Sequence, residues 1–233
     1  MNAISIIIPV YNEENILHDS ITFLISELDG RFKDYEIILS ENGSIDNTKE
    51  ILQVLGRKHE KIKVIIDEGV ADYGQALING ISSSKYNIIS ILEIDYLDID
   101  FLERSYQLMD KCDFVIGSKK ISKGIDQRPW KRRMLTGLYN YILRWMFHLT
   151  ITETHGLKTF NKQKLRSIVN SCVTKHAVFP SELTIRAARE KSIHHCEIPL
   201  SLPLREVRTT RISAKRRFKK TIADLLIMRQ AIK

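Results

Sequence analysis

The chain has 233 residues, enough for one substantial hydrophobic core, and its composition is that of an ordinary globular protein. It holds no run near the roughly 20 apolar residues that cross a bilayer, and Cys112, Cys172 and Cys196 support neither a disulfide framework nor a zinc site, so we expect a reducing cytosol. Residues 1–110 carry 9 basic and 20 acidic residues, and residues 111–233 carry 27 and 8, so the first half suits a divalent cation and the second suits phosphate or an anionic membrane surface.

Apolar runs of β-like composition alternate with helical patterns through the first half of the chain. Strands are predicted at residues 4–10, 35–40, 62–66, 87–92 and 113–117, and helices at 13–28, 47–59, 72–83 and 99–111. This βαβ repetition predicts an α/β fold, a mainly parallel twisted sheet with helices on both faces. The basic run 119–133, which contains Gly124 and Pro129, predicts a loop.

Three of the predicted strands end at polar or acidic residues. The binding crevice of an open parallel sheet lies outside the carboxyl ends of its strands. This pattern therefore indicates a ligand site at that edge and favours an enzyme. The junction residues are Tyr11 and Glu13 after the first strand, Glu41 and Asn42 after the second, and Glu93 and Asp95 after the fourth.

Five segments carry a resemblance to a known family. They read ISIIIPVYNEE, ILSENGSIDNT, GVADYGQALINGI, SILEIDYLD and DFVIGSKK in chain order. Together they resemble the family-2 glycosyltransferases of the GT-A fold, particularly the dolichyl-phosphate mannosyltransferase-like members. The resemblance implies a GT-A-like domain at 1–210, with a nucleotide-sugar and metal half at 1–118 and an acceptor half at 119–210. A basic amphipathic helix at 211–233 completes the chain.

The resemblance implies that the strand ends bind a nucleoside diphosphate sugar. The face of Tyr11 can stack on a base, and the Glu13 carboxylate can accept from ribose or base N–H groups. In the alternative without a donor, Tyr11 simply packs at the end of the strand, and Glu13 stabilises the N-terminus of the next helix. Asn42 replaces one of the family's two aspartates, so the base stays open. The predicted donor-binding residues are Pro9, Tyr11, Glu13, Glu41, Asn42, Gly74, Glu93 and Asp95.

Glu93-Ile94-Asp95 occupies the place of the family's Asp-x-Asp signature. Carboxylates two residues apart on a strand end point the same way, so both can reach one Mg²⁺ or Mn²⁺ that also binds a diphosphate. Such a metal neutralises charge on the leaving group. Glu93 is a departure from the signature, and Asp95 is the more secure ligand. Alternatively, residues 93–100 are only an acidic loop and helix start.

The acceptor side is predicted from shorter matches. The segment 152–158 resembles the family's Asp-Thr-x-x-Gly-Phe/Leu-Lys element, with Glu153 in place of the aspartate. Glu153 is then either a general base for a hydroxyl acceptor or a residue that positions a loop. Glu182 is a further candidate, so the predicted catalytic residues are Asp95, Glu153 and Glu182. The predicted acceptor or phosphate ligands are Lys119, Lys158, Arg205, Arg208 and Arg211.

Two stretches are amphipathic. Basic amphipathic helices are typical of membrane interfaces, although both apolar faces can instead pack on the protein's own core. No nucleic-acid motif appears. The predicted faces are Leu138, Ile142, Trp145, Met146 and Leu149, opposite Asn140, Arg144 and His148, and at the C-terminus Phe218, Ile222, Leu225, Leu226 and Ile232 beside Lys215, Arg216, Arg217, Lys219 and Lys220.

The resemblance implies a metal-dependent, inverting hexosyltransferase on the cytoplasmic membrane face. It would move a sugar from a nucleoside diphosphate to a polyprenyl phosphate of the dolichyl or undecaprenyl type. One alternative acceptor is a hydroxyl of a glycan. Another reading is a catalytically weak, nucleotide-binding, membrane-associated protein, which the departures at Asn42 and Glu93 favour.

Overall fold

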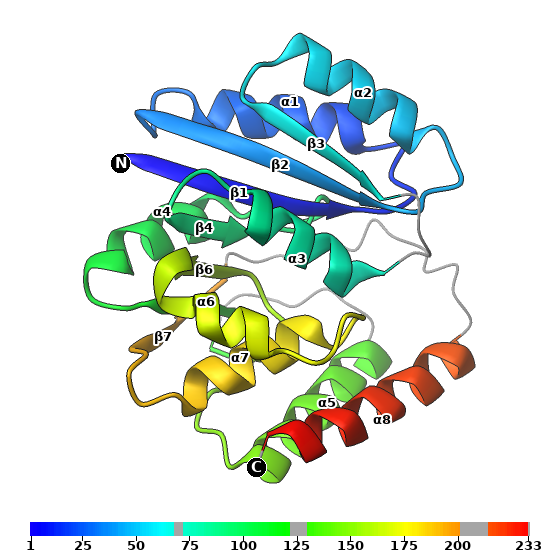
Figure 1. The fold of residues 1–233 in the computed structure, drawn as a ribbon, viewed down its shortest axis with the longest axis vertical. Coiled ribbons are helices and arrows are strands. Elements are labelled where there is room, and N and C mark those ends of the chain that lie inside the picture. The colour runs from blue at the N-terminus through cyan, green and yellow to red at the C-terminus, as the bar shows by residue number, and fades with distance from the viewer. Residues whose placement is uncertain (68–71, 122–129, 201–213, 233) are drawn as a thin grey trace.

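The computed structural model describes residues 1–67, 72–121, 130–200 and 214–232, without the side chains of 131–132 and 214–220. Seven strands and eight α-helices alternate along these residues (Figure 1). The elements are β1 Ala3–Val10, α1 Leu17–Leu28, β2 Asp34–Asn42, α2 Thr48–Lys58, β3 Ile62–Asp67, α3 Tyr73–Ser83, β4 Ile88–Ile91, α4 Ile99–Gln107, the 3₁₀ turn η1 Leu108–Asp110, β5 Phe114–Ser118, α5 Trp130–Phe147, β6 Lys158–Asn161, α6 Lys162–Ser171, α7 Phe179–Arg189, β7 His195–Pro199 and α8 Ala214–Ala231.

The strands form one sheet in the order β3-β2-β1-β4-β6-β5-β7. Strands β1 to β4 pair in parallel, and β6 runs antiparallel to both of its neighbours, β4 and β5. Strand β7 pairs in parallel with β5. The strand order reverses between β1 and β4, which makes their carboxyl ends the switch point where such sheets bind ligands.

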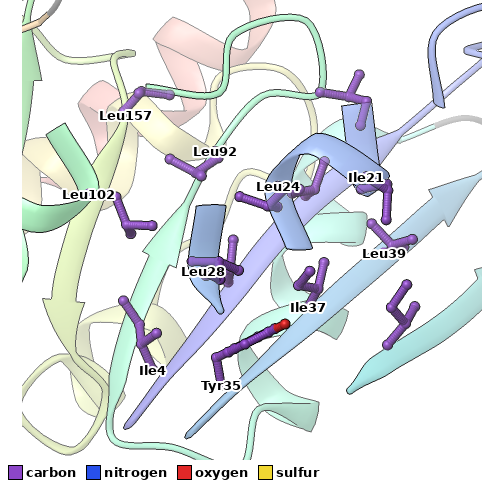
Figure 2. Packing of buried hydrophobic residues seen from close by; sticks show 14 of the residues in the cluster. Ile4, Ile21, Leu24, Leu28, Tyr35, Ile37, Leu39, Leu92, Leu102 and Leu157 are labelled. Atoms are coloured by element: carbon purple, nitrogen blue, oxygen red, sulfur yellow. The ribbon is translucent and has the colours of Figure 1, made fainter. Parts of the chain in front are cut away.

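Helices cover both faces of the sheet, as the sequence predicts. Helices α1, α2 and α4 pack on one face, where Ile4, Ile37 and Leu39 of the strands meet Leu24 and Leu28 of α1 (Figure 2). Helices α3, α6 and α7 cover the other face, and α5 and α8 extend that second core. Side chains that alternate along each strand therefore pack into two cores, one on each face of the sheet. This explains the almost continuous apolar runs of β1 and β2.

The predicted α/β fold with a mainly parallel sheet is confirmed. All five predicted strands and the four helices between them are present, and the predicted helix 99–111 ends in the 3₁₀ turn η1. Strands β6 and β7 were not predicted from the sequence. The loop expected at 119–133 is shorter than predicted at its C-terminal end, because α5 begins at Trp130; residues 122–129 lie outside the described part.

Helix α5 packs differently from the prediction. It buries Leu143 and Phe147, and its Asn140 is also buried, at 8% exposure. Asn140 tolerates burial because its amide donates to Glu153 Oε1 at 3.2 Å and its carbonyl oxygen accepts from Thr154 Oγ1 at 2.9 Å. The predicted apolar face is divided: Leu138, Ile142 and Trp145 are exposed, whereas Leu149 is buried and Met146 packs partly against the core. The helix therefore carries apolar residues on two faces.

The prediction that the cysteines form no disulfide is wrong. Cys112, the second residue after η1, is bonded to Cys196 in β7, with Cα atoms 6.2 Å apart. The two cysteines are 84 residues apart, so no local spacing signals the bond. The parallel pairing of β5 with β7, which places Val115 beside Cys196, brings them together. The expected reducing compartment loses its support with this bond.

None of the helices in the described part of the chain combines the length and the apolar character that crossing a bilayer requires.

Candidate functional site

The predicted junction residues meet at one edge of the sheet. The register aligns Val10 of β1 with Glu41 of β2, and Glu41 with Ile66 of β3, so three carboxyl ends lie level. Strand β6 begins at the same edge, because Lys158 pairs with Ile91 of β4 and with Ile116 of β5. The edge therefore collects acidic residues from the first strands and a lysine from β6.

The loop after β1 is fastened to the loop after β2. The Asn12 N–H donates to Ser44 Oγ at 2.9 Å, and Asn12 Oδ1 accepts from the Ile45 N–H at 2.9 Å. Asn12 has a left-handed backbone, with φ of 55°. The Glu13 N–H donates to Thr48 Oγ1 at 2.8 Å. These bonds fix the predicted donor-binding loop before any ligand arrives.

The predicted donor residues around this loop differ in exposure. Tyr11 is half-buried, so part of its ring remains open for stacking, whereas Glu13 is buried at 5% exposure. Pro9 is buried inside β1, opposite Ser40 of β2, and its place is structural. Tyr11 therefore offers the most accessible surface among these three predictions.

Glu41 is fully buried, and only one of its two carboxylate oxygens has a hydrogen-bond partner among the described residues. Its Oε1 accepts a short hydrogen bond from the Ser44 N–H, while Oε2 is buried with no hydrogen-bond partner among the described residues. A buried acceptor without a donor costs about 1–3 kcal/mol, unless a ligand supplies the donor. Asn42 follows it, buried at 6% exposure. This pair can read N–H and carbonyl groups on the edge of a base.

The acidic motif lies in a tight turn, which corrects the prediction of a strand end. Strand β4 ends at Ile91, and the Tyr96 N–H donates to the Glu93 carbonyl at 2.9 Å. The alternation that would aim Glu93 and Asp95 to one side does not apply in such a turn. The Glu93 carboxylate instead accepts a short hydrogen bond from the hydroxyl of Tyr73, the first residue of α3.

Tyr73 is a site residue that the sequence reasoning missed. Burial first, then the charges of Glu93 and Asp95, raise its pKa well above the usual value, so the phenol stays protonated and donates. Its ring also stacks with His155 at 6.1 Å between centroids. Burial raises the pKa of Glu93 to about 7, and the Tyr73 hydrogen bond opposes that rise only in part. Tyr73 lies in one of the five family-like segments, which is the signal that could have identified it.

The carboxylates of the turn suit a hard divalent cation in their chemistry, since Mg²⁺ and Mn²⁺ prefer oxygen ligands. Asp95 is half-buried, and its charge acts on both Tyr73 and Glu93. Among the described residues no group of three His, Cys, Asp or Glu side chains could hold a metal ion. The carboxylates of the turn match such a cation in donor type only; a cation here would need further oxygens from a bound diphosphate, and Asp95 stays its predicted protein ligand.

Two lysines face this acidic turn. Lys158 is buried at 1% exposure, and its Nζ donates to the Gly156 carbonyl at 2.6 Å. Burial lowers the pKa of Lys158 to about 7, although Glu153 and Glu93 favour its charged form. The partly exposed Lys119 acts on the charges of Glu93 and Glu153. Direct contact of Lys158 with an acceptor phosphate, which we predicted, does not fit this burial; Lys119 is the more accessible cation.

Glu153 is held inside its own loop. It is 2% exposed, and Oε1 accepts from the Thr154 N–H at 3.2 Å, the His155 N–H at 3.1 Å and the Asn140 amide at 3.2 Å. Burial alone would raise the pKa of Glu153, but Lys119 and these donors outweigh it and lower the pKa. An ionised, buried carboxylate that accepts from its own loop matches the positioning role better than the general base.

Glu182 also has a structural role. It is 0% exposed and binds the Val173 N–H at 2.9 Å, the Thr174 N–H at 2.7 Å and the Thr174 hydroxyl at 2.6 Å. Arg186 Nε, one helical turn later, donates to it at 2.8 Å. A carboxylate with this set of donors and no exposed surface cannot reach a substrate. The predicted catalytic role of Glu182 is therefore corrected to one of fixing the chain before α7.

Gly74 and Gly80 serve packing. A Cβ on Gly74 would collide with the backbone carbonyls of Lys175 and His176, and one on Gly80 would collide with the Ile7 side chain. Gly74 was predicted as a donor-binding residue. The structure gives a different reason for glycine at this position, which is the close approach of α3 to the protein's own backbone. The predictions for Arg205, Arg208 and Arg211 lie outside the described residues.

Comparison with known proteins now gives the family. Residues 5–177 match the sequence profile of glycosyl transferase family 2. Glycosyltransferase AglD of Haloferax volcanii is 21% identical over 192 residues, which cover 80% of this chain and 31% of that protein. Undecaprenyl-phosphate 4-deoxy-4-formamido-L-arabinose transferase of Edwardsiella ictaluri is 27% identical over 146 residues, 60% of this chain and 43% of that protein. The chain thus spans less than half the length of these curated relatives.

Solved structures give the same fold. Glucosyl-3-phosphoglycerate synthase from Mycobacterium tuberculosis, in complex with uridine diphosphate, superposes with a TM-score of 0.66 at 16% identity, covering 98% of this chain and 80% of that one. Its complex with Mg²⁺ and uridine diphosphate gives 0.67 at 17% identity, with coverage of 97% and 79%. Identities this low establish the GT-A-like fold alone. With that fold and a profile match over residues 5–177, the chain belongs to glycosyl transferase family 2.

Proposed function

We propose that this chain transfers a sugar from a nucleoside diphosphate sugar to a polyprenyl phosphate, with inversion at the anomeric carbon and with Mg²⁺ or Mn²⁺, at the cytoplasmic face of a membrane. Membership of the family supports the donor class. The name of one relative, an undecaprenyl-phosphate transferase, supports the acceptor class, as does the resemblance to dolichyl-phosphate mannosyltransferases.

The donor assignment rests on the edge of the sheet. Tyr11 offers a ring face for a base, and the uncommitted oxygen of Glu41 offers an acceptor for a base N–H. Asp95 would hold the metal, whose chemistry is to neutralise charge on the departing diphosphate. Lys119 lies near enough to Glu93 to add a positive charge there. We therefore assign donor binding to Tyr11, Glu41, Asn42 and Asp95.

The burial of the two candidate bases carries the acceptor assignment. A sugar hydroxyl is a poor nucleophile until a base removes its proton, whereas a lipid phosphate is already an anion at neutral pH. Glu153 and Glu182 are the carboxylates predicted for that task, and they are 2% and 0% exposed. An acceptor that needs no base agrees with this burial. The clamp for its phosphate is assigned from the sequence to Arg205, Arg208 and Arg211, with Lys119 beside the donor.

Two substitutions test the acceptor. With a phosphate acceptor, Glu153→Gln should lower turnover by less than about tenfold, and Arg208→Ala should raise the acceptor concentration needed for half-maximal rate strongly. Transfer is measured from labelled donors with Mn²⁺, using a short-chain polyprenyl phosphate and an oligosaccharide side by side. A loss of about a thousandfold in Glu153→Gln, with folding and donor binding intact, would favour the hydroxyl acceptor instead.

A second candidate is a nucleotide-binding protein with little or no turnover. The hydrogen bond between Tyr73 and Glu93 favours it, because it occupies a carboxylate that the family's signature gives to the metal. Calorimetry of donor binding with and without Mn²⁺, beside an assay of donor hydrolysis and transfer, separates the two candidates. Metal-dependent binding without any turnover on either acceptor would favour the second.

A further inference from the structure

Helix α5 exposes a surface of large apolar side chains. Their spacing of three and four residues places most of them on one side of the helix. Helix α8, which lies beside α5 (Figure 1), exposes more of them. We call this set the apolar surface; it comprises Trp130 (65% exposed), Met134 (58%), Leu135 (60%), Leu138 (54%), Tyr141 (65%), Ile142 (37%) and Trp145 (69%) of α5, and Ile222 (43%), Leu226 (56%) and Ile227 (50%) of α8.

The apolar surface is not needed to hold the helices in place. Leu143 and Phe147 anchor α5, and Met228 anchors α8, all at 2% exposure or less in one shared core. Large apolar side chains exposed in such number on neighbouring helices mark a site for a protein or a lipid. The surface therefore calls for an occupant outside the described part of the chain.

The charge of the two helices points to an anionic occupant. Their sequences contain ten lysines and arginines and a single acidic residue, Asp224, which is buried at 7% exposure. A second copy of the chain would bring two such basic sets together, and like charges across an interface oppose association. A surface of anionic lipids instead attracts each nearby lysine or arginine.

The residue types at the surface point the same way. Trp130, Tyr141 and Trp145 are amphipathic aromatics, which concentrate at the level of lipid headgroups. The exposed aliphatic residues Leu138 and Ile142 occur between them in the sequence, and such side chains can enter the acyl boundary. The combination of an apolar stripe, aromatic side chains and a basic sequence is that of a helix lying in a membrane interface.

We propose that α5 and α8 dock the protein on an anionic lipid surface, with the apolar surface entering the bilayer interface. The inference deepens the proposed function and rests on it, because docking of this kind would hold the site at the membrane that carries a polyprenyl phosphate. Binding to plain vesicles needs neither donor nor acceptor, so its failure is distinguishable from failure of transfer to a short-chain acceptor in solution.

The chain supplies its own reporter for the test. Both of its tryptophans, Trp130 and Trp145, belong to the apolar surface, so intrinsic fluorescence reports on α5 without background. Phosphatidylcholine vesicles containing phosphatidylglycerol should shift the emission to the blue, and brominated lipids should quench it. Pure phosphatidylcholine vesicles should do so far less, and high salt should reduce the effect.

Matched variants locate the surface. Leu138→Ser with Tyr141→Ser keeps both tryptophans and should raise the lipid concentration needed for half-maximal quenching by at least about tenfold. The control is Phe23→Ser with Val54→Ser, which removes side chains of 47% and 59% exposure from α1 and α2, at the other end of the molecule (Figure 1), and should change nothing. Circular dichroism checks that both variants fold.

Three results would overturn the proposal. The first is unchanged tryptophan emission with anionic vesicles. The second is equal quenching of the α5 variant and the unaltered protein. The third is a blue shift that appears without lipid as protein concentration rises, together with a dimer mass by light scattering, which would make a second copy the occupant.

Discussion

Two fully buried carboxylates, Glu41 at the sheet edge and Glu182 in α7, are held in opposite ways. Glu41 keeps one buried oxygen with no hydrogen-bond partner among the described residues, whereas both oxygens of Glu182 accept from backbone and side-chain donors. Both residues are 0% exposed. Burial alone therefore does not distinguish a ligand-binding carboxylate from a structural one; the hydrogen-bond partners do.

The largest expected effect concerns the carboxylate assigned to the metal. Asp95→Ala should lower sugar transfer by about a thousandfold or more, because the ion supplies several kcal/mol of charge stabilisation. The control is Asp100→Ala in α4, an exposed carboxylate that pairs with Arg104 at 2.7 Å. Initial rates with Mn²⁺, and with a chelator, measure the effect. Equal activity of the two variants, or indifference to the chelator, would contradict the metal assignment.

A direct comparison of Glu41 and Glu182 comes next. Glu41→Gln should weaken donor binding about tenfold or more, because a charged acceptor for a base N–H is lost. Glu182→Gln should leave donor affinity unchanged but lower the free energy of unfolding by about 1–3 kcal/mol, because buried donors lose their acceptor. Calorimetry of donor binding and urea denaturation measure the two quantities. The same defect in both variants would remove the distinction drawn between them.

A smaller effect is expected at Tyr73. Its hydrogen bond lowers the pKa of Glu93, which burial raises to about 7. In Tyr73→Phe the pKa of Glu93 should rise further, so a higher pH is needed to ionise it, and the rising limb of the rate profile should move to higher pH. The control is Tyr106→Phe, which removes a hydroxyl that accepts from the Asn2 N–H at 3.1 Å. A shift to lower pH would show that Tyr73 acts in another way.

Much of the fold could be predicted because its signals are local. Strands β1 to β5 and helices α1 to α4 each carry a periodic run of apolar residues bounded by polar ones. Strand β6 spans only Lys158–Asn161, and its existence depends on pairing with β4 and β5. The bond between Cys112 and Cys196 depends on pairing of β5 with β7. Contacts this distant in sequence leave no periodicity to read.

The site could be predicted in place but not in detail. The strand ends do bring Glu41, Asn42 and Glu93 to one edge, as their positions in the sequence require. The contacts of each side chain could not be predicted from the sequence pattern. Tyr73 lies 20 residues before the carboxylate it binds, and the burial of Glu153 and Glu182 follows from packing of α5 and α7.

Glu93 and Lys158 give the site a variable charge. Burial brings the pKa of both side chains to about 7, from opposite directions, so near neutral pH each is only partly ionised. An anionic diphosphate at this edge favours charged Lys158 and takes up protons, whereas a cation favours charged Glu93 and releases them. Proton exchange therefore accompanies ligand binding, and the heat of binding should depend on the ionisation enthalpy of the buffer. This dependence should have opposite signs for binding of the donor alone and for binding of the metal alone.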